Sequence, residues 1–186
     1  MIFVALLRGI NISGKNRIAM SELKKAVAEK YENVTTYLNS GNVIFESGSD
    51  DKEIIRKDIQ QLIADHFDLD IPVFVSSQDE LEELLNHAPE WWATADKKIY
   101  DNLIFLIPPT KCQEVFDALG QLKPEIEKAA EYANSIFWSF DLDNYRKSDW
   151  WVRSASMDIR DRITMRTANT VKKVLEICRK QEETVK

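Results

Sequence analysis

The segment VTTYLNSGNVIFES, residues 34–47, limits the folds open to this chain more than any other stretch. Two runs rich in β-branched and aromatic residues flank Asn39-Ser40-Gly41-Asn42, and these residue types tolerate the backbone angles of tight turns. We therefore predict two adjacent antiparallel strands. A hairpin here is incompatible with a purely parallel sheet whose strands alternate with helices.

The first half of the sequence continues this pattern on both sides of the hairpin. Residues 2–7 form a continuous apolar run, which is typical of a buried strand. Helical spacing of apolar residues begins near Ser21 and again after Asp50, and IPVFVSS (71–77) predicts a further strand. The resulting order is β-α-β-β-α-β, the ferredoxin-like or split-βαβ arrangement with an antiparallel four-stranded sheet.

The second half predicts the same order with weaker signals. IYDNLIFLI (99–107) is a strand, Thr110 and Gln113 suggest a capping box, and a hairpin turns at Asn134-Ser135. A helix over about 143–158, a short strand at RITMR (162–166) and a closing helix complete this half.

We predict an α+β protein with two ferredoxin-like subdomains, each built on an antiparallel sheet. The first covers 1–76. A linking helix and loop follow at 77–97, and this helix begins with the capping box Ser77-Gln78-Asp79-Glu80. The second subdomain covers 98–186 and includes the closing helix.

Composition narrows the classes of function. The 186 residues carry a formal net charge of −6, but the segments 1–48 and 146–186 have more basic than acidic groups. Only two cysteines occur, and neither they nor the two histidines have metal-ligand spacing. No apolar run approaches the roughly 20 residues that span a bilayer, and we expect no secretory signal at the N-terminus. We expect a cytoplasmic protein without a metal, a cofactor or a membrane segment.

The loop RGINISGKNR (8–17) matches the spacing G-x-x-x-x-G-K of a phosphate-binding P-loop. Three features oppose that reading. Asn16 replaces the hydroxyl residue that would hold Mg²⁺, the next helix begins several residues later, and the hairpin at 34–46 contradicts a parallel sheet. Two readings stay open: a structural connection with glycines, or an anion site of another kind.

A second basic segment, 160–173, precedes and opens the closing helix. An exposed helix start beside Arg166 can hold a phosphate or carboxylate. Alternatively, Thr167 or Asn169 simply caps the helix and the basic residues pair with acids. If the two halves pack face to face, this segment and the loop 8–17 would line one cleft. The candidate ligand-binding residues are Arg8, Asn11, Lys15, Asn16, Arg17, Ser40, Asn42, Arg166 and Asn169.

Other side chains that often carry chemistry form no catalytic set. His66 and His87 have no nucleophile nearby in sequence, and the paired carboxylates are typical of solvated helix faces. The pairs Trp91-Trp92 and Trp150-Trp151 contain adjacent side chains that point in different directions. We expect them to pack in a core or between the halves, with at least one of each pair partly exposed.

Three longer stretches resemble a bacterial family classified as domain of unknown function number 1697. They are VALLRGINISGKNRIAMSELK (4–24), TYLNSGNVIF (36–45) and TMRTANTVKKVLEI (164–177). The resemblance implies a two-subdomain α+β fold related to ferredoxin-like units and supplies no activity. Two positions depart from the family pattern: Ser13 stands where a second glycine is common, and Thr167-Ala168 replaces an Asn-Trp pair.

Three functions remain open at this point. The first is a binding protein that uses the loop 8–17 for a small anionic ligand or a nucleic-acid segment. Nucleic acid is the weaker form, because the net charge is negative and the strands lack the paired aromatics of RNA-binding sheets. The second is an enzyme acting on a phosphorylated metabolite, with Lys15 and Arg8 as anion clamps. The third is a protein–protein interaction module that takes no ligand.

Overall fold

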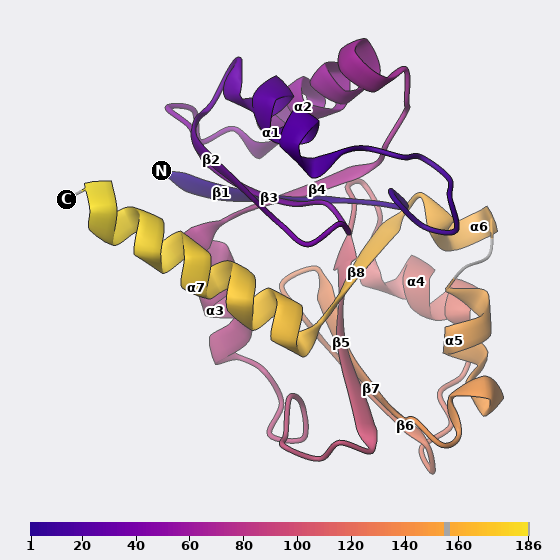
Figure 1. The fold of residues 1–186 in the computed structure, drawn as a ribbon. Coiled ribbons are helices and arrows are strands. Elements are labelled where there is room, and N and C mark those ends of the chain that lie inside the picture. Colours follow the sequence, from indigo (N-terminus) through magenta and orange to yellow (C-terminus); the bar gives the residue numbers. More distant parts are fainter. Residues whose placement is uncertain (155–156, 186) are drawn as a thin grey trace. The chain divides into compact units, whose positions relative to one another are not determined.

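The structure is a computed structural model that describes residues 1–154 and 157–185. The chain forms two compact units. Unit one consists of residues 1–83 together with the described residues from 172 onward, and unit two consists of residues 84–171. Each unit contains one four-stranded antiparallel sheet, so the predicted α+β fold with two similar subdomains is confirmed (Figure 1).

Unit one has the predicted β-α-β-β-α-β order and the strand order β2-β3-β1-β4. All its strand pairs are antiparallel, and β1 lies between β3 and β4. Its elements are β1 (Ile2–Leu7), α1 (Met20–Ala28), β2 (Glu32–Tyr37), β3 (Asn42–Glu46), α2 (Lys52–Phe67) and β4 (Val73–Ser77).

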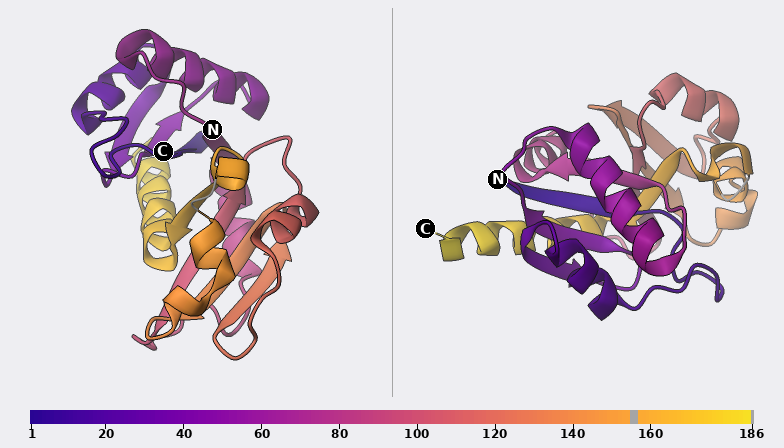
Figure 2. Two further views of the ribbon diagram at one scale, coloured as in Figure 1. Left: turned by 90° about the vertical axis from the view of Figure 1, so that its right-hand side faces the viewer. Right: turned by 90° about the horizontal axis from the view of Figure 1, so that it is seen from above.

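One face of this sheet packs against α1 and α2, which lie together on the same side (Figures 1 and 2). Alternate residues of β1 face them, because successive side chains of a strand point to opposite faces. The Asp51 carboxylate starts α2 by accepting hydrogen bonds from Glu53 N and Ile54 N at 3.0 and 3.1 Å. The core on this face includes Phe3, Ala5, Leu7, Leu23, Val27, Phe45, Ile55, Ile59 and Ile63.

The other face of the first sheet is also buried, as Val4, Leu6 and Ile44 show. Helix α7 (Ala168–Val185) lies on the side of the sheet opposite α1 and α2 (Figure 1). The Gln181 amide ties α7 to β2 by donating to Asn33 O and Thr35 Oγ1, both at 2.8 Å. The face that an RNA-binding sheet would leave open is therefore not open here.

The described residues of the closing helix from 172 onward belong to unit one. The sequence suggested instead that this helix is part of the second subdomain. Its buried stripe of Val171, Val174, Leu175 and Cys178 matches the predicted spacing. The stripe predicts that the helix packs on an apolar surface, but it does not say which sheet provides that surface.

Helix α3 (Gln78–Asn86) begins with the predicted capping box. Ser77 Oγ accepts from Glu80 N at 3.2 Å, and the Glu80 carboxylate accepts from Ser77 N at 3.1 Å. Two backbone donors that no helical carbonyl can reach are thereby satisfied.

Unit two repeats the strand order of unit one, as β6-β7-β5-β8. Its helices differ, because three short ones stand where we predicted a single helix over 143–158, a range that includes residues 155–156 outside the described part. The elements are β5 (Ile99–Leu106), α4 (Cys112–Leu119), β6 (Glu127–Tyr132), β7 (Ser135–Asp141), η1 (Tyr145–Lys147), α5 (Asp149–Arg153), α6 (Met157–Arg160) and β8 (Ile163–Thr167).

The capping box predicted at Thr110 and Gln113 is wrong by one residue. Helix α4 has Lys111 as its N-cap, and the Glu114 carboxylate accepts from Lys111 N at 2.8 Å. A carboxylate is the stronger acceptor for this backbone amide, and it also suits the positive end of the helix. The predicted stop at Gly120 is confirmed, with φ at +84°.

Tryptophan side chains build much of the core of unit two. Trp138 and Trp150 are fully buried, and their ring centroids lie 5.8 Å apart. The indole of Trp150 donates to Gly120 O at 2.8 Å, and that of Trp92 donates to Asn102 O at the same distance. One member of each tryptophan pair is thus buried, while Trp91 is half-buried and Trp151 is 39% exposed.

Candidate functional site

The loop 8–17 is a small hairpin. Asn11 N donates to Asn16 O at 3.1 Å, and Lys15 N donates to Ile12 O at 2.9 Å. The two residues between them, Ser13 and Gly14, have φ of +49° and +77°, as a type I′ turn requires. Lys15 therefore follows a hairpin tip, and α1 begins only at Met20. This geometry agrees with the rejection of a P-loop, in which the glycine loop leads directly into a helix.

Two asparagine side chains hold this hairpin in place. Asn11 forms a pair of hydrogen bonds with the Ile18 backbone, through Oδ1 from the N–H and Nδ2 to the carbonyl, both at 2.9 Å. Its Nδ2 also donates to Asn39 O at 2.9 Å. Asn16 Nδ2 donates to Gly9 O at 3.1 Å. Both asparagines have positive φ, which asparagine adopts more readily than most residues.

The turn between β2 and β3 lies beside the start of the loop. Leu7 N donates to Gly41 O at 2.8 Å, next to the bond from Asn11 to Asn39. Asn42 is fully buried and shapes the turn, because its amide donates to Tyr37 O at 2.7 Å and to Ser40 Oγ at 3.1 Å. The structure thus brings Ser40 and Asn42 close to the loop.

Two of the three basic residues of the loop are exposed cations. Within the described chain, Lys15 and Arg17 form no ion pair, and no acidic residue precedes Glu22 in the sequence. Basic residues elsewhere in unit one, such as Lys30 and Arg56, do pair with carboxylates. Arg8 is half-buried, and its backbone N–H donates to Pro72 O at 2.9 Å.

The remaining two candidates, Arg166 and Asn169, lie in unit two. Arg166 is buried, and its Nη1 donates to Thr164 Oγ1 at 2.9 Å and to Met165 O at 2.8 Å. Thr167 Oγ1 accepts from Thr170 N at 3.3 Å, so a threonine caps α7. Asn169 lines a cavity of about 510 Å³, together with Tyr100, Asp101 and Lys97. The shared cleft of the two basic segments stays a prediction.

The histidines are engaged in structural contacts. The His87 ring stacks on Tyr132 with centroids 4.1 Å apart, and His66 Nε2 lies 3.1 Å from a Glu29 carboxylate oxygen.

Across residues 1–154 and 157–185 there is no cluster of three side chains suited to a metal ion, and no helix long and apolar enough to cross a bilayer.

Sequence reasoning missed the backbone groups of the turn that support the loop. Asn39 and Gly41 support the loop through their carbonyl oxygens, which any residue type carries. The signal available in the sequence was the glycine itself, since a glycine in a turn indicates either positive φ or a close backbone approach.

Comparison with known proteins supports the fold and leaves the activity open. A family model described as "Protein of unknown function (DUF1697)" matches residues 1–137. The solved structure of conserved bacterial protein SP0830 from Streptococcus pneumoniae matches 95% of this chain and 98% of its own length, with a TM-score of 0.82 and 24% identity. This similarity shows a shared fold. No curated protein matches.

Proposed function

The chain belongs to the DUF1697 family, whose description assigns no activity, and we propose from its own geometry that it is a binding protein for a phosphate-bearing ligand. The ligand is held at the hairpin 8–17, next to the turn 38–42. The observation that carries this proposal is a rigidly held loop with two exposed cations, Lys15 and Arg17, that pair with no carboxylate of the described chain.

Preorganisation supports a binding role. Five residues of the loop have positive φ, and hydrogen bonds from Asn11 and Asn16 fix the backbone in that shape. Non-glycine residues at positive φ cost free energy, which neighbouring contacts must offset. A loop already held in one conformation loses less entropy when it binds than a mobile one.

Backbone donors add to the two cations. Within the part of the chain that the structure describes, the N–H groups of Ser13 and Gly14 donate no hydrogen bond. They lie at the tip of the hairpin, adjacent to Lys15. Backbone N–H groups beside fixed positive charges are the usual elements of an anion site outside helix termini. In Figure 2 the hairpin, coloured indigo, extends away from the sheet of its own unit.

The shared chemistry of the ligand is the phosphate group, which either a metabolite or a nucleic-acid strand supplies. We propose a cytoplasmic setting, since Cys112 and Cys178 are both free thiols and a reducing compartment keeps them so. Arg8 is half-buried at the base of the loop and contributes a third positive charge there.

Replacing the lysine tests this proposal. Lys15→Ala should leave the fold intact, because the side chain is exposed and only its backbone N–H holds the turn. Thermal unfolding is measured with inorganic phosphate, nucleotides with and without Mg²⁺, sugar phosphates, and short RNA and DNA. A ligand at a hundred times its dissociation constant stabilises the wild-type protein by about 2.7 kcal/mol. We expect that stabilisation to fall sharply in Lys15→Ala.

The matched control is Lys25→Ala, which removes an exposed lysine paired with Glu22 on α1. It should keep the full ligand effect. The salt dependence then separates the two sources of phosphate, since affinity for a nucleic-acid strand falls steeply with salt according to the number of phosphates neutralised. If no ligand stabilises the protein, or if both variants respond alike, the loop is not an anion site and an interaction role becomes the better hypothesis.

A further inference from the structure

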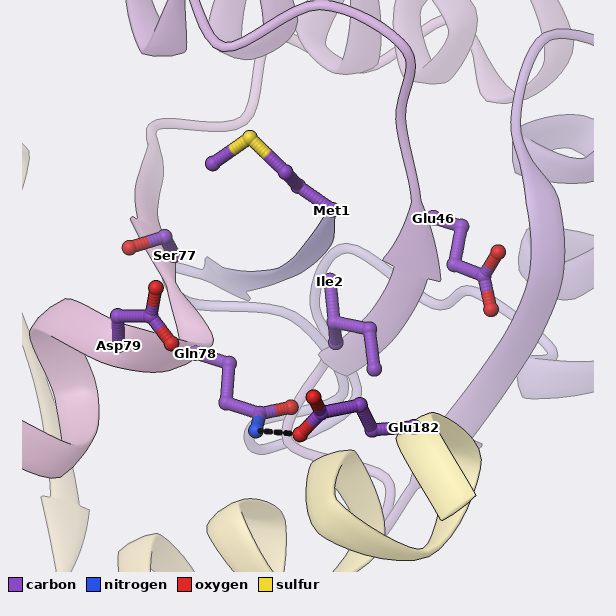
Figure 3. A pocket seen from close by; sticks show the side chains of 7 residues that line it. All are labelled: Met1, Ile2, Glu46, Ser77, Gln78, Asp79 and Glu182. Atoms are coloured by element: carbon purple, nitrogen blue, oxygen red, sulfur yellow. Dashed lines mark hydrogen bonds between the residues drawn. The ribbon is translucent and has the colours of Figure 1, made fainter. Parts of the chain in front are cut away.

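Unit one contains a second candidate site, which shares no residue with the loop 8–17 and differs from it in chemistry. A cavity of about 260 Å³ opens where the N-terminal end of β1 meets α3 and the last turns of α7 (Figure 3). Its lining combines an apolar part with three carboxylates. The residues that matter for the argument are Met1, Ile2, Glu46, Gln78, Asp79 and Glu182.

The charged side chains of this cavity are all acceptors: the carboxylates of Glu46, Asp79 and Glu182. No lining side chain is basic, and the N-terminal ammonium of Met1 already donates to Ser47 O at 3.1 Å. The Gln78 amide Nε2 is already used, since it donates to Glu182 Oε2 at 2.9 Å, drawn as a dashed line in Figure 3. A ligand that enters this cavity therefore has to bring hydrogen-bond donors.

Gln78 provides an independent observation that points to a ligand, namely a buried side-chain acceptor without a partner in the described chain. Its side chain reaches across the cavity towards Glu182 (Figure 3), and the residue is 7% exposed. Its Oε1 is buried and accepts no hydrogen bond within the described chain. A buried acceptor without a partner is unfavourable, and native proteins contain few of them. A donor group placed in the cavity would satisfy it.

Strand pairing places another carboxylate beside Glu46. Glu46 is the register partner of Glu32 across β2 and β3, so two carboxylates stand directly opposite each other. Like charges in such a pair are destabilising. Within the described chain, the Glu46 carboxylate forms no ion pair and accepts a hydrogen bond from the neutral Asn33 amide at 2.9 Å, which does not compensate its charge. A cation bound nearby would relieve this repulsion.

We propose that this cavity binds an organic cation, a primary ammonium group on a short aliphatic chain. The ammonium donates to Gln78 Oε1 and to the carboxylates of Asp79 and Glu182, and the aliphatic chain contacts Met1 and Ile2. A bare metal ion fits less well, because the described side chains offer no cluster of three ligating groups and part of the wall is apolar. The inference does not depend on the phosphate proposal.

The test uses 1,4-diaminobutane as the probe and 1,4-butanediol as its neutral counterpart, at constant ionic strength. Backbone NMR shifts of the full chain are followed during titration. The diamine should cause saturable shifts centred on Ile2, Glu46 and residues 77–79, whereas the diol should cause none. Glu182→Gln and Gln78→Met should each weaken binding about tenfold, since the first removes the negative charge that faces the ammonium and the second removes the amide acceptor.

The matched control is Glu183→Gln, which removes the same charge from the neighbouring exposed position outside the cavity lining. Its affinity for the diamine should match that of the wild type. The proposal is overturned if the diol binds as tightly as the diamine, if Glu183→Gln weakens binding as much as Glu182→Gln, or if no saturable shifts occur in wild-type protein whose spectrum shows it to be folded.

Discussion

Gly41 stands where the β2–β3 turn meets the end of β1. Its φ is +79°, and a Cβ added there would lie 2.7 Å from Leu7 Cβ and 2.8 Å from Ile10 Cδ1. Both the backbone conformation and the space therefore require glycine. Gly41→Ala should destabilise the protein by about 2–3 kcal/mol, because the strain of positive φ adds to a clash with buried side chains. Urea unfolding measures the change.

Two other glycines supply graded controls for this prediction. Gly9 has φ of +68° but open space around it, so Gly9→Ala should cost only the backbone strain, about 1 kcal/mol. Gly48 has neither constraint, and Gly48→Ala should stay within about 0.5 kcal/mol of the wild type. Equal effects at Gly41 and Gly48 would show that the turn does not contact β1 as the structure describes.

The residues of the loop show what a sequence can and cannot predict at this scale. Glycine and asparagine types correctly indicated a loop with unusual backbone angles. The same reasoning gave Asn11 and Asn16 as candidate ligand contacts, which stays a prediction; in the structure their amides bond to Ile18, Asn39 and Gly9. A side-chain amide that builds a loop and one that binds a ligand look identical in sequence, because only the partner distinguishes them.

At the scale of whole elements, the sequence predicts a helix start well where the residues that form the cap are close together in the chain. Ser77 with Glu80 and the acidic start of α2 were predictable, since a capping side chain and its target lie within three residues. The error at α4 also has a local cause, because Thr110 and Gln113 match the pattern one residue before the pair Lys111 and Glu114 that forms the bond. A short motif defines a helix start only to within a residue or two.

The capping box of α3 should make the stability of the protein depend on pH. Burial raises the pKa of Glu80, but hydrogen bonds from Lys52, Ser77 N and Ser76 outweigh it and hold the pKa below its ordinary value of 4.5. A lowered folded-state pKa stabilises the protein above the unfolded value and loses that effect as pH falls through the folded value. Glu80→Gln should therefore be less stable than the wild type at pH 7, and the difference should shrink as the pH falls below 4.5.

The expected difference at pH 7 is below about 1 kcal/mol, since the Glu80 side chain is about half exposed and solvent screens its charge. Glu80→Ala also loses the acceptor for Ser77 N, so it should cost about 1 kcal/mol even at low pH and more than Glu80→Gln at pH 7. Glu125→Gln, at an exposed position outside any described hydrogen bond, is the control. A gap between Glu80→Gln and the wild type that grows as the pH falls would contradict the sign of this argument.

At the scale of the whole molecule, the sequence indicates repetition but not how distant segments combine. Both sheets have the same strand order because the same succession of elements occurs twice. Helix α7 follows β8 of the second sheet, yet most of it groups with the first unit. The bond between Gln78 and Glu182 joins residues 104 positions apart, and no motif in the sequence pairs them. Long-range partners of this kind leave no local pattern.

Removing residues 172–186 tests whether α7 completes unit one. The shortened chain loses the bonds of Gln181 to β2 and the ion pair of Arg179 with Glu82, and with them the buried side chains of Leu175 and Cys178. Hydrogen exchange should then show faster exchange of the β1 and β3 amides, while β5 and β7 in unit two stay protected.

Leu175→Ala in the full chain should also destabilise unit one, by about 2–3 kcal/mol, because it removes a buried side chain without shortening the helix. If β5 and β7 lost protection while β1 and β3 kept it, α7 would belong to the second subdomain, as the sequence alone suggests.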